Sequence, residues 1–152
     1  MSLRILTVCL GNICRSPAAE AVIRSKAAEA GIDVEVESAG TGSYHIGESP
    51  HPKSTAAGGR RGYTVAGAAR QLRRDDFDRF DLILTMDESN LSNARRIAPE
   101  SSKAELRSLM SYVDSGEVPD PWGQPDSAYE HMYDLIEQAV DALIADLQEL
   151  PS

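Results

Sequence analysis

The chain has 152 residues, of which 41% are hydrophobic and 26% are charged, and its formal net charge is −9. These values are typical of one globular domain, residues 1–152, that buries a core, and the negative charge argues against nucleic acid or an anionic membrane as a partner. Since the sequence has no long apolar run, no signal-peptide design at residues 1–4 and only two cysteines, it predicts a cytoplasmic protein in a reducing compartment.

The first expected element is a buried strand over residues 3–8, a short apolar run. A loop then leads to a helix start in the segment Val8-Cys9-Leu10-Gly11-Asn12-Ile13-Cys14-Arg15-Ser16-Pro17. Ser16 is the expected N-cap and Pro17 the first helical residue, so a helix should cover residues 16–30. The loop over residues 10–15 therefore wraps over a helix N-terminus, where unpaired backbone N–H groups and the helix dipole can hold an anion of about two charges.

Cys9 and Arg15 stand six positions apart at the two ends of this loop. Arg15 offers a planar fork that can bind two phosphate oxygens, and Cys9 would lie beneath the anion in a positive field that favours its thiolate. The pattern predicts a phosphate-binding loop with a cysteine nucleophile. Cys14 has two interpretations, packing beneath the loop or trapping an oxidised Cys9 as a disulfide, and the second makes the loop redox-sensitive.

A metal site, a nucleotide-binding loop and a structural cysteine each account for fewer residues of this loop. Zinc needs about four ligands, and the chain has no third cysteine and no metal-binding histidine spacing, so no metal is expected. A nucleotide-binding loop would end in Gly-Lys-Ser or Gly-Lys-Thr, whereas this loop ends in Arg15-Ser16. If Cys9 were only a buried structural cysteine, the Gly-Asn pair that follows it and the arginine six positions later would remain unexplained.

The remainder of the chain alternates strand and helix patterns. The further expected strands cover residues 34–39, 81–86 and 106–110. The further expected helices or helical turns cover residues 53–62, 74–80, 87–97 and 125–149. The last of these carries an apolar stripe expected to be core: Tyr129, Met132, Tyr133, Ile136, Val140, Leu143 and Leu147. Such alternation predicts a single doubly wound α/β domain, a parallel sheet flanked by helices, with its ligand at the carboxyl ends of the strands.

A thiolate that displaces an alkoxide or phenolate from phosphorus needs a proton donor for the leaving oxygen, which arginine and backbone amides do not supply. The candidate donor is Asp120, because the prolines on both sides stiffen its backbone, although Pro-Asp-Pro alone is commonly a turn. Leu10 and Ile13 on the loop rim, with Tyr44 and Trp122 from two other loops, would hold a flat ring. The other interpretation of Trp122 is that it caps the last helix.

Several segments of the chain match one known family in order: 8–22, 38–41, 69–72, 81–91 and 120–121. Over nearly its whole length the chain resembles the low-molecular-weight protein-tyrosine phosphatases. The resemblance implies a four-stranded parallel sheet in the order 2-1-3-4, a phosphocysteine intermediate and no cofactor. It also implies a tyrosine-phosphorylated protein as substrate and partner, and we expect a monomer or weak dimer.

The resemblance also assigns roles to residues. Cys9 is the nucleophile, Arg15 binds phosphate, and Asp120 is first the acid and then the base. Ser16 hydrogen-bonds the thiolate, while Asn12 and Ser38 brace the loop. The residues expected around the substrate are Leu10, Gly11, Asn12, Ile13, Cys14, Ser16, Tyr44 and Trp122. Two features depart from many relatives: the Gly67 region lacks a loop-bracing histidine, and Trp122 stands without a second aromatic residue after Asp-Pro.

Three other functions compete with this interpretation. Protein-arginine phosphatases typically have threonine where this chain has Ile13, and an apolar Ile13 suits a phenyl ring better than a guanidinium. Arsenate reductases of this fold need cysteines beyond Cys14, which the chain lacks. A non-catalytic phosphotyrosine-binding module would have no need of Cys9 or Asp120, and both are present.

Overall fold

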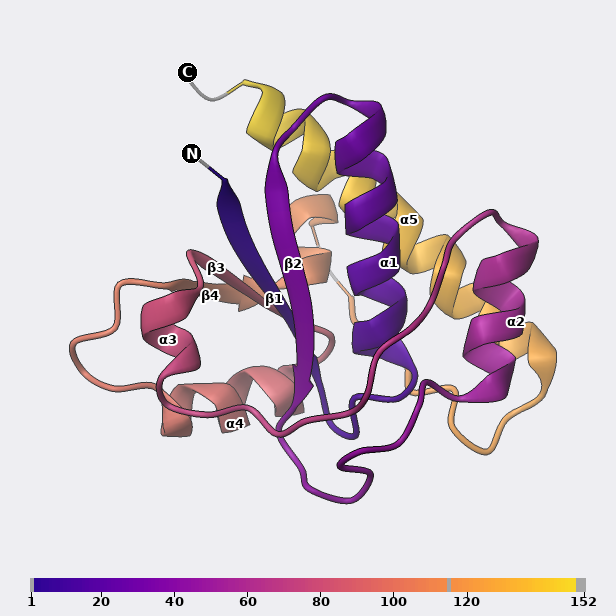
Figure 1. Ribbon diagram of the computed structural model, residues 1–152, viewed down its shortest axis with the longest axis horizontal. Helices are drawn as coiled ribbons and strands as arrows, with labels where there is room; N and C mark the ends of the chain where they lie inside the picture. The colour runs from indigo at the N-terminus through magenta and orange to yellow at the C-terminus, as the bar shows by residue number, and fades with distance from the viewer. Residues whose placement is uncertain (1, 115, 150–152) are drawn as a thin grey trace.

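In the computed structural model, which describes residues 2–114 and 116–149, four strands form one parallel sheet in the order β2-β1-β3-β4. The strands are β1 (Leu3–Cys9), β2 (Val34–Gly40), β3 (Leu82–Thr85) and β4 (Glu105–Ser108). Figure 1 shows β1 and β2 side by side near the middle of the molecule. The predicted α/β class and strand order are therefore confirmed.

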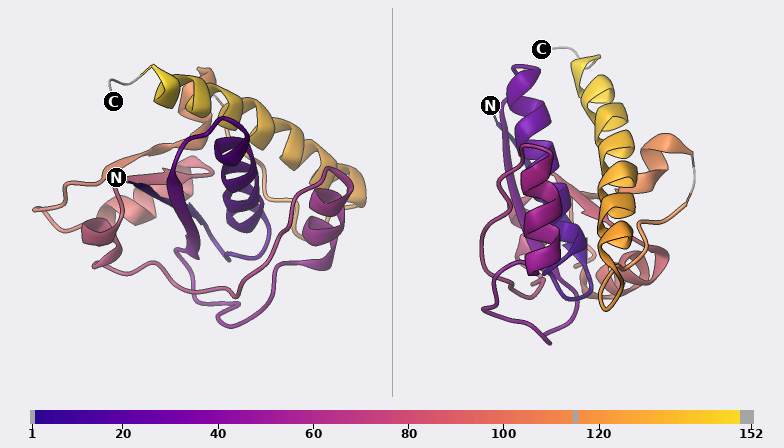
Figure 2. Two further views of the ribbon diagram at one scale, coloured as in Figure 1. Left: turned by 45° about the horizontal axis from the view of Figure 1, so that its top comes forward. Right: turned by 90° about the vertical axis from the view of Figure 1, so that its right-hand side faces the viewer.

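Helices cover both faces of this sheet. They are α1 (Arg15–Glu29), α2 (Pro52–Arg60), α3 (Asp76–Arg79), α4 (Glu88–Ile97) and α5 (Asp126–Gln148), with a 3-10 turn η1 (Leu109–Val113). Figure 2 shows α1 and α5 together on one side of the sheet, and α3 and α4 lie on the other. Among the described residues, no helix is both long and apolar enough to cross a bilayer.

The two faces of β1 belong to two separate hydrophobic clusters, which explains its continuous apolar run. Ile5 and Cys9 join the cluster beneath α1 and α5, whereas Leu6 and Val8 join the cluster beneath α3 and α4. Because side chains alternate along a strand, the nucleophile candidate Cys9 faces the side where α1 begins.

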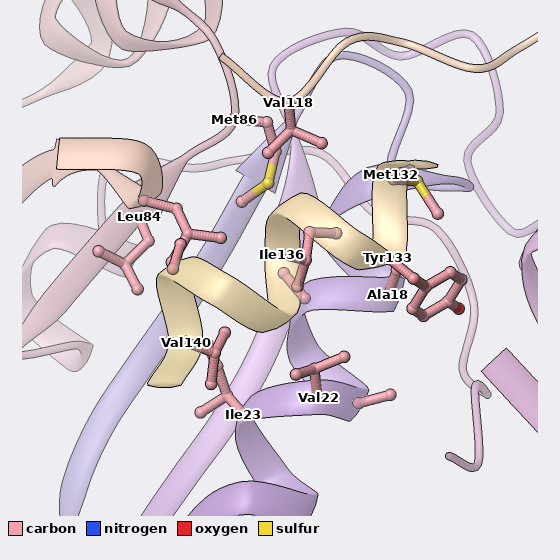
Figure 3. Packing of buried hydrophobic residues seen from close by; sticks show 14 of the residues in the cluster. Ala18, Val22, Ile23, Leu84, Met86, Val118, Met132, Tyr133, Ile136 and Val140 are labelled. Atoms are coloured by element: carbon pink, nitrogen blue, oxygen red, sulfur yellow. The ribbon is translucent and has the colours of Figure 1, made fainter. Parts of the chain in front are cut away.

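The predicted stripe of α5 is part of the larger cluster, and only Leu147 in it is partly exposed. Figure 3 shows Ile136 and Val140 of α5 lying over Val22 and Ile23 of α1. This packing fixes α1 on the sheet, so the loop at the N-terminus of α1 has a rigid base.

Two predicted boundaries are wrong. The N-cap of α1 is Cys14, and Pro17 is the third helical residue, because the Ser16 hydroxyl binds the Cys9 and Asn12 side chains and caps no helix. The fourth strand ends at Ser108, since the next residues turn inward as η1 and bury Leu109 and Met110 beside α5.

Candidate active site

The loop after β1 curls around the sulfur of Cys9. Asn12 has a φ of 59°, a left-handed conformation that asparagine tolerates better than most residues, and its backbone N–H donates to Cys9 Sγ at 3.2 Å. Ser16 Oγ lies 3.0 Å from the same sulfur. Since Ser16 Oγ also accepts a hydrogen bond from Asn12 Nδ2 at 2.8 Å, its own proton can point to the sulfur. The sulfur therefore lies within reach of two hydrogen-bond donors.

The Asn12 side chain ties this loop to two other segments. Its Nδ2 donates to Ser38 Oγ of β2 at 2.9 Å, and its Oδ1 accepts from the backbone N–H of Arg70 at 2.9 Å. Gly67, with a φ of +111°, leaves a hollow of about 170 Å³ behind the loop, which Asn12 and Ser38 help to line. Both N–H donors of the Asn12 amide and one acceptor position of its oxygen are therefore paired without a histidine from this region.

Arg15 extends from the first turn of α1 beneath the site and is 3% exposed. Its Nη1 donates to Asp87 Oδ2 at 2.5 Å and to the carbonyl of Val118 at 3.1 Å. Burial opposes the charge, but Cys9 and Asp87 outweigh burial and raise the pKa of the guanidinium. Arg15 is thus a permanently charged group in a fixed position, as a phosphate fork requires.

Asp120 lies at the mouth of the site, in the loop before α5. The backbone N–H of Val118 donates to the carbonyl of Met86 at 2.8 Å, which anchors this loop beside the end of β3. Asp120 Oδ1 accepts from the backbone N–H of Trp122 at 3.1 Å, and Oδ2 lies 3.8 Å from Arg15 Nη2. The side chain is 46% exposed, so Oδ2 can exchange a proton with a leaving group or water.

Asp87 is the other carboxylate near the site. Its Oδ2 accepts from Arg15, and its Oδ1 accepts from the backbone N–H of Asn90 at 2.7 Å as the N-cap of α4. Because both oxygens are engaged as acceptors, Asp87 is suited to orienting Arg15 and not to delivering a proton. The helix expected over residues 87–97 begins at this cap, whereas the contact of Asp87 with Arg15 had no signal in the sequence.

A pocket of about 160 Å³ opens above Cys9. The residues that line it are Cys9, Leu10, Gly11, Ile13, Cys14, Arg15, Tyr44, His45, Asp120 and Trp122. Of the residues expected around the substrate, Asn12 and Ser16 do not line the pocket and lie behind the loop, where Ser38 also contacts Asn12.

His45 is the lining residue that the sequence did not indicate. Its Nδ1 lies 2.9 Å from Glu48 Oε2, and its ring lies so close to Gly11 that a Cβ there would stand 2.9 Å from His45 Cδ2. The available signal was its position next to Tyr44, an expected wall of the pocket. The glycine thus allows the imidazole to lie over the phosphate-binding loop.

The two cysteines of the loop are free thiols with different surroundings. Cys14 is buried, and burial raises the pKa of its thiol to about 11, while its Sγ lies 3.5 Å from the hydroxyl of Tyr129. At neutral pH Cys14 is therefore a neutral thiol that does not compete with Cys9 as a nucleophile. Within residues 2–114 and 116–149, no three His, Cys, Asp or Glu side chains gather as a metal site would require.

Comparison with known proteins gives a consistent result. The family model described as low molecular weight phosphotyrosine protein phosphatase matches residues 4–151. A low molecular weight protein-tyrosine-phosphatase of Streptomyces coelicolor is 41% identical over 98% of this chain and 96% of its own. A protein tyrosine phosphatase of Entamoeba histolytica superimposes with a TM-score of 0.93 at 35% identity, covering 97% of this chain and 98% of its own. A drosophila arginine phosphatase superimposes with a TM-score of 0.93 at 26% identity, covering 98% of this chain and 100% of its own.

Proposed function

Because this chain belongs to the low molecular weight phosphotyrosine protein phosphatase family and is a protein-tyrosine phosphatase, we propose that it hydrolyses aryl phosphate monoesters through a phosphocysteine at Cys9. The observation that carries this mechanism is the meeting of Cys9, Arg15 and Asp120 at one pocket. A nucleophile, a phosphate fork and a proton donor are the groups that such a reaction requires.

The first step is attack of the Cys9 thiolate on phosphorus. A sulfur–phosphorus bond forms, the bond to the phenolic oxygen breaks, and Asp120 gives the departing oxygen its proton. Arg15 and the backbone N–H groups of the loop bind the other phosphoryl oxygens, where the transition state spreads its charge.

The second step hydrolyses the phosphocysteine. Asp120, now a carboxylate, takes a proton from water as the water oxygen attacks phosphorus. The sulfur–phosphorus bond breaks, inorganic phosphate leaves, and Cys9 returns as a thiolate. The half-exposed position of Asp120 supports this second role, since water can reach Oδ2.

Phosphotyrosine in proteins is the proposed substrate. Apolar Leu10 and Ile13, with Tyr44 and Trp122, line the space above the sulfur, and such walls suit a phenyl ring. A guanidinium needs polar partners, and the arginine phosphatase is the more distant relative, at 26% identity against 41% for the Streptomyces phosphatase.

Steady-state kinetics on matched phosphopeptides test this assignment. The value of kcat/KM should be at least about 10²-fold higher for phosphotyrosine than for phosphoserine or phosphoarginine in the same peptide, because only the aryl group fills the pocket and leaves as a phenolate. Arsenate should inhibit and not be reduced. A preference for phosphoarginine would contradict the proposal and favour the alternative substrate.

The same proposal extends to the setting of the reaction. We propose that residues 1–152 act as a single phosphatase domain on phosphoproteins in the cytoplasm, as a monomer or weak dimer, without nucleic acid or membrane as a partner. The free thiols of Cys9 and Cys14 support a reducing compartment, and the net charge of −9 disfavours anionic surfaces.

Reversible oxidation of the site is also expected. Peroxide should convert Cys9 to a sulfenic acid, which the Cys14 thiolate attacks, forming a disulfide as the sulfenic oxygen leaves as hydroxide. Because the pKa of Cys14 is raised to about 11, its thiolate fraction, and with it the rate of disulfide formation, should rise roughly tenfold per pH unit between pH 6.5 and 8.5. Free-thiol titration after a peroxide pulse measures this rate.

The Cys14→Ser and Cys14→Ala variants provide the comparison. After mild peroxide and then dithiothreitol, the parent should recover its activity, whereas both variants should recover poorly because Cys9 proceeds to sulfinic acid. Equal recovery in parent and variants would assign Cys14 to packing against Tyr129.

A further inference from the structure

Asp76, the first residue of α3, is a buried charged group that the proposed mechanism does not use. Its side chain is 0% exposed, and a carboxylate in such a place is destabilising unless it is paired and hydrogen-bonded. The guanidinium of Arg70 meets it as a fork, since Nη1 donates to Oδ2 at 2.9 Å and Nη2 donates to Oδ1 at 3.0 Å. The backbone N–H of Arg73 also donates to Oδ2, at 2.8 Å. The pair therefore holds the Arg70 side chain at one defined place beside α3.

The backbone of Arg70 lies against the phosphate-binding loop. Its N–H donates to Asn12 Oδ1 at 2.9 Å, and its carbonyl accepts from the N–H of Gly40, the last residue of β2, at 2.9 Å. Gly40 in turn lies so near the loop that a Cβ there would stand 2.6 Å from the carbonyl oxygen of Leu10. The Arg70 side chain thus ties α3 to the backbone segment that contacts both β2 and the loop.

The N–H of Arg70 decides which way the Asn12 amide faces. Because this N–H is a donor, the amide turns its oxygen toward Arg70, and its nitrogen then faces Ser16 and Ser38. The Ser16 hydroxyl, which accepts from that nitrogen, lies 3.0 Å from Cys9 Sγ. The backbone N–H of Asn12 donates to the same sulfur at 3.2 Å from a left-handed conformation, with φ at 59°. A displaced Arg70 N–H would therefore disturb both groups that contact the sulfur.

On its other side, Arg70 borders the hollow behind the loop. This hollow of about 170 Å³ is lined by Arg70, Asn12, Ser38 and Gly67, and Gly67 has no side chain to fill it. A segment that borders a hollow lacks packing contacts there, so its position depends more on the contacts of its opposite side. For Arg70 those contacts include the buried carboxylate of Asp76.

We propose that Arg70 and Asp76 are positioning residues for the nucleophile. The buried pair holds the Arg70 N–H against Asn12, and Asn12 then orients the two groups that contact Cys9 Sγ. Neither residue of the pair lines the pocket, so both act through Asn12 and not on the substrate. This inference rests on the proposed function, because it concerns how the proposed nucleophile is held for attack.

A double-mutant cycle between Arg70 and Asn12 tests the proposal. Arg70→Lys keeps a positive charge beside Asp76 but loses the fork, and Asn12→Gly removes the amide at a position whose φ suits glycine. Single-turnover release of nitrophenolate from p-nitrophenyl phosphate should slow by about tenfold in each variant, since misplaced groups can cost up to about 10²-fold. The double variant should be no slower than Asn12→Gly alone, because the effect of Arg70 passes through Asn12.

Thermal unfolding and phosphate binding separate positioning from a purely structural role. Rates are expressed per folded protein, and the Kd for inorganic phosphate should change less than the rate, since the contacts of Arg15 are unaltered. Arg73→Lys is the matched control and should react at the parental rate, because its side chain pairs with Asp75 at the surface. Asp76→Asn should reproduce the loss seen with Arg70→Lys, and if it fails to fold, the cycle with Arg70→Lys alone decides the result.

Two results would overturn the positioning role. One is a parental rate per folded protein in Arg70→Lys, with or without a lower Tm, which would assign the pair to stability alone. The other is a double variant in which the two losses multiply, which would show that Arg70 and Asn12 act independently. Failure of the parent itself to form a phosphocysteine at Cys9 would instead contradict the proposed function, and the positioning role would fall with it.

Discussion

Replacing Cys9 with serine should lower kcat on aryl phosphates by at least about 10⁴-fold while leaving phosphate binding in place. A serine hydroxyl stays protonated where the thiol ionises, so the contacts from Asn12 N–H and Ser16 would no longer stabilise an anionic nucleophile. The phosphate contacts of the loop and Arg15 do not depend on the sulfur. Stopped assays with a phosphate sensor give kcat, and calorimetric titration with inorganic phosphate gives Kd.

Replacement of Arg15, which lies beneath the site, should lower catalytic activity nearly as much as replacement of Cys9. Arg15→Lys should lose about 10²-fold or more in kcat/KM, because a point charge cannot replace a fork that also contacts Asp87 and Val118. Arg24→Lys is the matched control on the same helix, since Arg24 pairs with Glu20 on the outer surface of α1. Substantial hydrolysis by Cys9→Ser, or equal effects of the two arginine changes, would contradict the assigned roles.

The effect of Asp120→Asn should depend on the leaving group. Protonating a poor leaving group such as tyrosine phenolate is worth about 10²- to 10⁴-fold, whereas the more acidic nitrophenolate needs less help. The first chemical step should therefore slow far more on phosphotyrosine than on p-nitrophenyl phosphate, and single-turnover kinetics measure this step. With p-nitrophenyl phosphate the variant should accumulate phosphocysteine, because no carboxylate then activates the attacking water.

The pH profile of the same variant gives a second measurement. The parent should show a bell-shaped profile, as expected for a reaction that needs an ionised nucleophile and a protonated acid together. Asp120→Asn should lose the falling limb, and Asp126→Asn, at an exposed aspartate nearby in sequence, should keep it. If Asp120→Asn loses the same factor on both substrates and keeps the falling limb, Asp120 is a turn residue, and Asp87 is the next carboxylate to test despite its two acceptor contacts.

The parts of this protein that could be predicted from sequence are those set by short-range geometry. The spacing of Cys9 and Arg15 lies within one loop and one helical turn, so it indicated a phosphate-binding loop without knowledge of the rest of the fold. The apolar run of β1 and the stripe of α5 likewise indicated a buried parallel strand and a core helix, both of which the structure confirms. The strand order itself came from family resemblance.

Tertiary structure decided the contacts between distant segments. Ser16 is of a residue type that favours the N-cap, yet the helix begins one residue earlier, at Arg15, and the Ser16 hydroxyl binds Cys9 and Asn12 in the curled loop. The pairing of Asp87 with Arg15 likewise had no signal in local spacing, and the only signal for His45 was its position next to Tyr44. The sequence by itself determined the phosphate-binding loop and the elements around it, since their contacts lie within a few residues. The walls and the proton donor of the site come from separate loops, which the parallel strands bring to one edge of the sheet.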